Sequence, residues 1–100
     1  MVIEVDVKQE TALVRVTGDL DLISRPLLAE RLSAALAAGP RRLVLDLAGA
    51  GFMDVGSARV VASAGEFLPD GARLIIRRPN PVVRRILELT GYDSGCEIVD

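Results

Sequence analysis

The amino-acid sequence predicts an α/β sandwich, in which three or more helices pack against one mixed sheet of four to five strands. Three observations carry this prediction: two alternating segments near the N-terminus, one nearly continuous apolar segment in the middle, and helical segments interleaved with strands. The expected order of elements is β-β-α-β-α-β-α-β. A chain of 100 residues is long enough for one core and too short for two, so residues 1–100 are predicted to form a single domain.

The first two strands are predicted from the alternation of apolar and polar residues. Residues 2–8 place every second, apolar side chain on one face, and residues 12–17 alternate in the same way. The two connecting residues, Gln9-Glu10, favour an antiparallel hairpin, although neither is typical of a tight hairpin turn.

The first helix is predicted between a capping residue and a glycine. Ser24 followed by Arg25-Pro26 is typical of a helix N-cap with proline in the first turn, where the missing N–H of proline is not needed. Gly39-Pro40 then ends this helix.

The middle of the chain predicts a buried strand and a second helix. Residues 43–47 are almost continuously apolar, which is typical of a central strand covered on both faces. Asp54 is expected to cap a helix over residues 55–67, because its carboxylate can accept the N–H of Gly56 or Ser57.

The last third of the chain predicts two short strands around a third helix. Residues 72–77 form the first of these strands, and Asn80-Pro81 begins a helix that continues through Thr90 and is closed by Gly91. Residues 97–99 are expected to add a short edge strand.

Composition excludes several classes of function. With 12 basic and 14 acidic residues the net charge is −2, which argues against nucleic-acid binding driven by bulk charge. The chain has no histidine and one cysteine, Cys96, which excludes an internal disulfide, a zinc site and a histidine-based catalytic triad. The N-terminus does not resemble a signal peptide, and no apolar run approaches the roughly 20 residues that span a bilayer. We therefore expect a cytoplasmic protein without membrane insertion.

Four aspartates, Asp19, Asp21, Asp46 and Asp54, could be mistaken for a magnesium site. The sequence contains neither a phosphate-cradling glycine loop nor a nucleophile, so we expect no metal, no cofactor and no enzymatic activity. Asp46 is instead expected to accept turn N–H groups at the end of its strand. The pair Arg77-Arg78 is interpreted as a solvated face, with docking of an acidic partner as the alternative.

Residues 44–61 carry the most informative pattern in the chain. A buried strand runs through a tight turn into Phe52-Met53-Asp54, and a helix follows. This run resembles the signature of the STAS domain, the fold of bacterial anti-sigma factor antagonists, which reads roughly D-L-x-x-V/L-x-F-M/I-D-S-S-G-L-G-V-L. Three further segments also resemble the family pattern, so the resemblance covers nearly the whole chain in order: Gly18-Asp19-Leu20-Asp21, Pro69 to Leu74, and Pro81 to Gly91.

In the STAS family the second serine of this signature is phosphorylated by a partner kinase. The ungapped alignment places that acceptor on Gly56, which has no hydroxyl. Ser57 is a possible substitute, but one residue along a helix rotates the side chain by about 100°. Sliding the alignment by one would bring Ser57 into place, but would set Ala58 and Arg59 where the family has glycine and leucine. We therefore expect no phosphorylation switch of the usual kind.

The resemblance implies a non-catalytic protein-interaction module that resembles an anti-sigma factor antagonist. Its implied partner is an anti-sigma factor with a histidine-kinase-like ATPase fold, and its binding would free a sigma factor. We expect a monomer. The implied partner-binding residues lie on the loop before the first helix and at the start of the second: Asp19, Asp21, Ser24, Asp54, Val55, Gly56, Ser57 and Arg59.

Other interpretations of the same residues stay open. STAS domains also act as accessory subunits of bacterial membrane transporter ATPase complexes, and loss of the phosphoacceptor suits such a permanent subunit equally well. Asp54 would cap a helix whatever the function, and Ser57 is also explained as a tolerated small polar residue. Gly56 is also explained by close approach of a partner or of the Asp19–Asp21 loop.

Overall fold

In the computed structural model, which describes residues 1–90 and 96–100, five strands form one mixed sheet with helices packed against it. The predicted α/β fold and its order of elements are confirmed. The predicted closing residue of the third helix, Gly91, lies outside the described residues. The elements are β1 (Val2–Lys8), β2 (Thr11–Thr17), α1 (Arg25–Ala37), β3 (Arg42–Gly49), α2 (Val55–Glu66), β4 (Arg73–Arg77), α3 (Pro81–Leu89) and β5 (Cys96–Val99).

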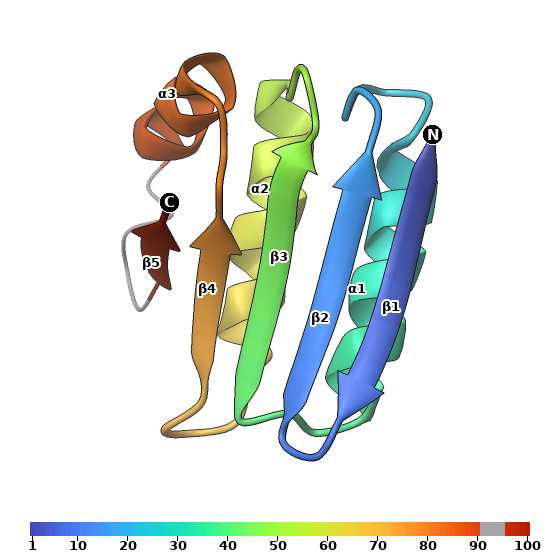
Figure 1. Ribbon diagram of the computed structural model, residues 1–100, viewed down its shortest axis with the longest axis vertical. Coiled ribbons are helices and arrows are strands. Elements are labelled where there is room, and N and C mark those ends of the chain that lie inside the picture. Colours follow the sequence, from blue (N-terminus) through green and yellow to red (C-terminus); the bar gives the residue numbers. More distant parts are fainter. Residues whose placement is uncertain (91–95) are drawn as a thin grey trace.

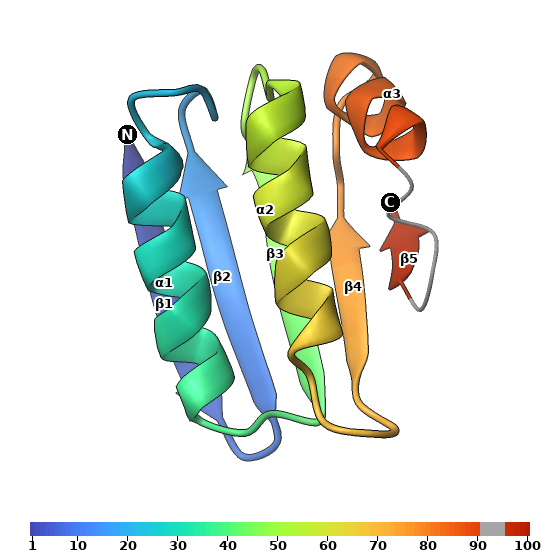
Figure 2. The same ribbon diagram turned by 180° about the vertical axis from the view of Figure 1, so that it is seen from behind.

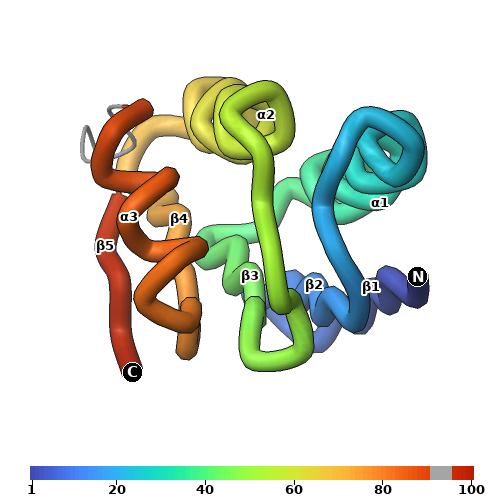
Figure 3. The backbone as a smooth tube through the Cα atoms, turned by 90° about the horizontal axis from the view of Figure 1, so that it is seen from above, coloured from blue at the N-terminus to red at the C-terminus, as the bar shows by residue number. Residues whose placement is uncertain are grey.

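The strands lie in the sheet in the same order as in the chain, β1 to β5 (Figure 1). β1 and β2 are antiparallel, and the predicted two-residue connection is confirmed, with Gln9 at a φ of +54°. The pairs β2–β3, β3–β4 and β4–β5 are parallel, so each needs a crossover segment, and each crossover carries one helix. α1 and α2 lie side by side on the same face of the sheet, while α3 lies over the end of β4 and β5 (Figures 2 and 3).

The hydrophobic core fills the space between the sheet and the α1–α2 layer. Ala12 and Val14 of β2 lie in register with Leu43 and Leu45 of β3, and all four side chains are fully buried. α1 contributes Leu28, Leu32 and Ala35, and α2 contributes Ala58, Val61 and Ala64. Small residues on both helices allow them to pack close to an aliphatic sheet.

The predicted cover on both faces of the central strand is found only in part, because helices cover one face and the other face is covered by side chains alone. The face of β3 opposite the helices carries Val44, which is half-buried, and Asp46, which is only 1% exposed. Asp46 is covered by arginine side chains, because its Oδ2 accepts from Arg77 at 3.3 Å and from Arg78 at 2.8 Å. Both arginines are partly exposed, as the interpretation of a solvated face expected, but they also bind Asp46. Asp46 accepts a backbone N–H at 3.0 Å, but that N–H belongs to Ala48 within β3, so the predicted acceptance of turn N–H groups is not seen. An apolar run cannot distinguish helix coverage from coverage by long charged side chains.

Asp46 makes the stability of this protein depend on pH in acid. Burial opposes its ionisation, but the Ala48 N–H and the Arg78 and Arg77 guanidiniums outweigh burial and hold the pKa of Asp46 below its ordinary value. A carboxyl group whose pKa is lowered on folding stabilises the protein above the unfolded pKa of 3.8, and this contribution is lost as the pH falls through the folded value.

We predict that Asp46→Asn lowers the free energy of unfolding at pH 7 by about 1–3 kcal/mol and flattens its decline below pH 4. Both arginines stay partly exposed and can reach water, so a loss near the lower end is expected. Urea unfolding of both proteins between pH 2 and pH 7 measures the effect. Asp70→Asn at the exposed turn before β4 is the matched control and should change little. Parallel pH curves for wild type and Asp46→Asn would contradict the prediction.

Candidate functional site

Two loops meet where the parallel strands β2 and β3 end, at the upper edge of the sheet in Figure 1. Leu20 donates its N–H to the carbonyl of Phe52 and accepts the N–H of Asp54, both at 2.9 Å. The side chains of Leu20 and Met53 are fully buried beneath this pairing. The structure thereby places residues 19–24 beside the start of α2, which brings most of the predicted partner-binding residues to one corner.

The loop before α1 is held by its own polar side chains. Asp21 Oδ1 accepts from the N–H of Ile23 at 3.0 Å and of Ser24 at 3.1 Å. The Ser24 hydroxyl donates to the carbonyl of Asp19 at 2.9 Å and accepts the N–H of Asp21 at 3.0 Å. With its polar atoms turned inward, the loop projects Leu22 and Ile23 outward, where they are 71% and 90% exposed.

The predicted capping role of the Ser24 side chain is wrong. α1 begins at Arg25 as expected, but Ser24 makes no side-chain hydrogen bond to the first turn. Its backbone has φ −83° and ψ −11°, which is already helical, whereas a capping residue is typically extended. The hydroxyl therefore tightens the preceding loop.

Asp54 caps α2 and also binds α1. Its Oδ1 accepts the N–H of Ser57 at 2.7 Å, which confirms the predicted N-cap, and its Oδ2 accepts from Nη2 of Arg25 at 2.8 Å. Burial raises the pKa of Asp54, but the Ser57 N–H and the Arg25 guanidinium together hold that pKa below its ordinary value. The carboxylate is thus ionised at neutral pH and ties the first turns of the two helices together.

Gly56 leaves space that is filled from the other helix. A Cβ atom built at position 56 would lie 2.3 Å from Nη2, 2.4 Å from Cζ and 2.7 Å from Nη1 of Arg25. The group nearest to this position is therefore the guanidinium of Arg25, which the sequence analysis did not foresee. Arg25 is 29 residues from Asp54 in the chain, and no local pattern could have indicated this contact.

The remaining predicted residues point in different directions. Ser57 is 0% exposed, and its hydroxyl has no hydrogen-bond partner in the described part of the chain. Val55 is exposed beside Asp54. Arg59 lies one turn further along α2 and lines a groove of about 390 Å³ between the helices, together with Ala29, Leu32, Ser33, Leu36, Val60, Ser63, Ala64 and Phe67.

Sequence reasoning missed four residues of this corner. Arg25 supplies its cation, and Leu22, Ile23 and Phe52 supply exposed apolar surface. Two adjacent apolar residues directly after a turn aspartate were a usable signal for Leu22 and Ile23, because a core-facing role would require alternation or helical spacing.

The corner combines apolar side chains with one ion pair, a composition typical of a protein-binding surface. Within residues 1–90 and 96–100, no group of three or more histidine, cysteine, aspartate or glutamate side chains is placed to hold a metal ion. Over the same residues, no helix is both long and apolar enough to cross a membrane.

Comparison with known proteins gives one consistent result. The family model described as "Mlab, STAS domain" matches residues 3–100. The anti-sigma-F factor antagonist RsfB of Mycobacterium tuberculosis is 27% identical over 83 residues, which cover 83% of this chain and 68% of that protein. The crystal structure of an anti-sigma factor antagonist from Mycobacterium paratuberculosis is 26% identical, with a TM-score of 0.88 over 97% of this chain and 83% of that one.

A third relative shares the fold at lower identity. The Bacillus cell fate determinant SpoIIAA in its phosphorylated form has a TM-score of 0.74 and 20% identity, covering 99% of this chain and 92% of that one. Because the family model matches residues 3–100, almost the entire sequence, the chain belongs to the STAS domain family.

Proposed function

We propose that this protein is a non-catalytic interaction module that binds an anti-sigma factor and acts as its antagonist. The observation that carries the proposal is the apolar surface of Leu22, Ile23, Phe52 and Val55, exposed on the two loops and the first turn of α2. The similarity to RsfB and to the Mycobacterium paratuberculosis protein, both named as anti-sigma factor antagonists, supports it.

The proposed partner is an anti-sigma factor with a histidine-kinase-like ATPase fold, as the family resemblance implies. Binding through this corner would release the sigma factor by competition. Burying one large aliphatic side chain is worth about 1.5–3 kcal/mol, so Ile23, which is 90% exposed, offers the largest single gain. Asp21 and Ser24 contribute indirectly, because their hydrogen bonds hold the loop that presents Ile23.

We infer that this antagonist works without the usual phosphorylation switch. Gly56 offers no acceptor oxygen, and the Ser57 hydroxyl is buried, so a kinase could reach it only if the start of α2 opened. SpoIIAA shows that a protein of this fold can carry a phosphate. The described surface of the present chain offers no equivalent group at position 56, which suits a constitutive binder whose activity follows its abundance.

A second candidate function is an accessory subunit of a bacterial membrane transporter ATPase complex. The absence of a hydroxyl at position 56 favours this function too, because a permanent contact needs no phosphorylation switch. The nature of the ATPase that is bound distinguishes the two functions.

The deciding experiment isolates the tagged protein from its native cells and identifies its partners by mass spectrometry. A soluble kinase-like ATPase is then purified, its affinity for this protein is measured by calorimetry, and release of its bound sigma factor is followed on addition of this protein. Release of sigma factor at stoichiometric amounts supports the proposal. Binding of a membrane transporter ATPase, or binding without release, contradicts it.

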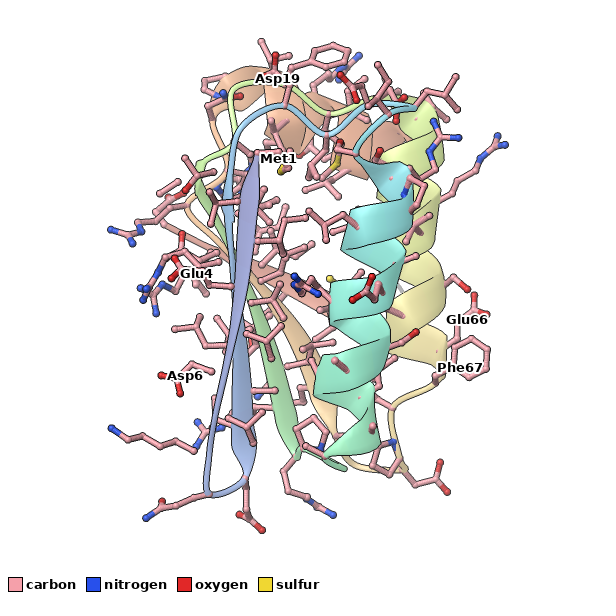
Figure 4. The ribbon with its side chains drawn as sticks, turned by 90° about the vertical axis from the view of Figure 1, so that its right-hand side faces the viewer. Met1, Glu4, Asp6, Asp19, Glu66 and Phe67 are labelled. Atoms are coloured by element: carbon pink, nitrogen blue, oxygen red, sulfur yellow. The ribbon has the colours of Figure 1, made fainter. Side chains whose placement is uncertain are left out.

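We predict that Ile23→Ser weakens binding to the anti-sigma factor about 10- to 100-fold, as expected for the loss of an apolar interface anchor. The fold should be unaffected, because the side chain is almost fully exposed. Phe67→Ser is the matched control: Phe67 is 75% exposed at the opposite end of α2, far from Asp19 in Figure 4. Calorimetric titration of the three proteins measures the effect, and equal losses for both variants would refute a docking site at this corner.

We also predict that Ser57 receives no phosphate when the folded protein is incubated with the partner kinase and ATP. Ser57→Ala should leave partner affinity unchanged and keep or raise stability by about 0–1 kcal/mol, because it removes a buried hydroxyl that has no partner. Intact-mass spectrometry and urea unfolding provide the measurements. Stoichiometric phosphate on Ser57 would overturn the inference of an absent switch.

A further inference from the structure

The guanidinium of Arg25, the first residue of α1, fills the space beside Gly56 in the first turn of α2. The guanidinium of Arg25 lies where a side chain at position 56 would begin, since three of its atoms are within 2.7 Å of a Cβ built on Gly56. Heavy atoms that are not bonded do not approach so closely, so a side chain at position 56 requires the guanidinium, which is the far end of a flexible side chain, to leave this place.

Arg25 is held in this place by Asp54. Nη2 donates to Asp54 Oδ2 at 2.8 Å, while Nε is buried without a hydrogen-bond partner in the described part of the chain. A buried donor without a partner costs free energy, so the position of the guanidinium is a compromise that the ion pair and the space above Gly56 make favourable. Glycine in a helix is itself about 1 kcal/mol less favourable than alanine, which is consistent with a specific need for that space.

We propose that Arg25 determines what position 56 can hold, so that this chain presents a fixed cation where the family signature has a phosphorylatable serine. A guanidinium keeps its positive charge at every physiological pH, whereas a phosphoserine would bring a charge of about −1.5 to −2 to the same place. Because the guanidinium is paired with the ionised Asp54 carboxylate, this pair is close to neutral, whereas a phosphorylated acceptor would add negative charge beside it. This interpretation for partner binding rests on the proposed function, whereas the exclusion between the two side chains does not.

The proposal has a consequence for restoring a switch. A serine placed at position 56 must first displace the guanidinium of Arg25, and we expect this displacement to weaken the ion pair with Asp54. Two substitutions, and not one, are then required to place a hydroxyl at the start of α2 without disturbing the link between the helices.

The test is a cycle of four proteins: wild type, Gly56→Ala, Arg25→Ala and the double variant. Alanine is chosen because its Cβ alone is enough to meet the guanidinium and because it introduces no new hydrogen bond. Urea unfolding at pH 7 gives the ratio of folded to unfolded protein. With Arg25 removed, Gly56→Ala should raise this ratio through helix propensity. With Arg25 present, this gain should be cancelled or reversed. The change in the folded-to-unfolded ratio caused by Gly56→Ala should therefore differ about five- to tenfold between proteins with and without Arg25, as for other contacting pairs.

A second readout follows the carboxylate directly. In Gly56→Ala the Asp54 pKa, measured by carboxylate NMR, should rise as it does in Arg25→Ala, because both changes remove the same guanidinium. Gly65→Ala is the control within the same helix: its added Cβ would meet Leu74 at 3.1 Å, and its effect should be the same with and without Arg25.

The outcomes separate this inference from the proposed function. Equal effects of Gly56→Ala in both backgrounds, with an unchanged Asp54 pKa, overturn the coupling of Arg25 and position 56 whatever the protein binds. If the coupling is present and the anti-sigma factor binds Gly56→Ala and Arg25→Ala about tenfold more weakly than wild type, both statements are supported. If the coupling is present but no anti-sigma factor binds wild type, the inference about Arg25 and position 56 is supported and the proposed function fails.

Discussion

The backbone pairing between the two upper loops is the constraint on which the rest of this corner depends. β2 and β3 are parallel, so their carboxyl ends reach the same edge of the sheet, and pairing continues beyond them through Gly18 N–H to the Gly49 carbonyl at 2.9 Å. Near this end the register of the β2–β3 pair shifts. The two strands lie so close together that a Cβ on Gly49 would be 2.7 Å from the Val16 carbonyl oxygen. Leu20 completes the pairing from its buried position. Arg25 and Asp54 can meet only because this backbone arrangement sets where α1 and α2 begin.

Two carboxylates in this protein are stabilised by the same means in different settings. Asp46 is covered on the open face of the sheet by Arg77 and Arg78, and Asp54 is bound at the helix layer by Arg25. In each case a backbone N–H also donates to the carboxylate. The same open face is also polar at its edge, where Glu4 and Asp6 of β1 project away from the helices (Figure 4). Arginine suits both places, because its planar group can cover a carboxylate while its stem packs against apolar neighbours.

Local patterns in the sequence were sufficient for the order of the elements and for the starts of α2 and α3. Alternation located β1 at residues 2–8, and Asp54 and Asn80 both accept the N–H three residues ahead, as N-cap residues do. The prediction that the Ser24 side chain caps α1 was wrong because the sequence around Ser24 is typical of a cap, whereas its backbone geometry is set by the turn around Asp21.

Contacts between distant residues lay beyond sequence reasoning. The apolar run in β3 predicted cover on both faces, but it could not show that the cover over Asp46 comes from arginines more than 30 residues later. The filling of Gly56 by Arg25 likewise requires two helices to be placed relative to each other, which no single segment encodes. Family resemblance directed attention to this corner of the molecule, and only the three-dimensional structure shows which side chains are turned outward there.

The inward hydrogen bonds of the loop before α1 make the shape of this loop independent of the side chains that it exposes. Asp21 and Ser24 direct their polar atoms to the backbone of the loop itself, so its shape does not depend on the side chains at positions 22 and 23. Substitutions at these two positions can therefore accumulate during evolution with little effect on the fold. Under the proposed function, a duplicated copy of such a domain could acquire a new binding preference by point mutation at these two positions while keeping the same fold.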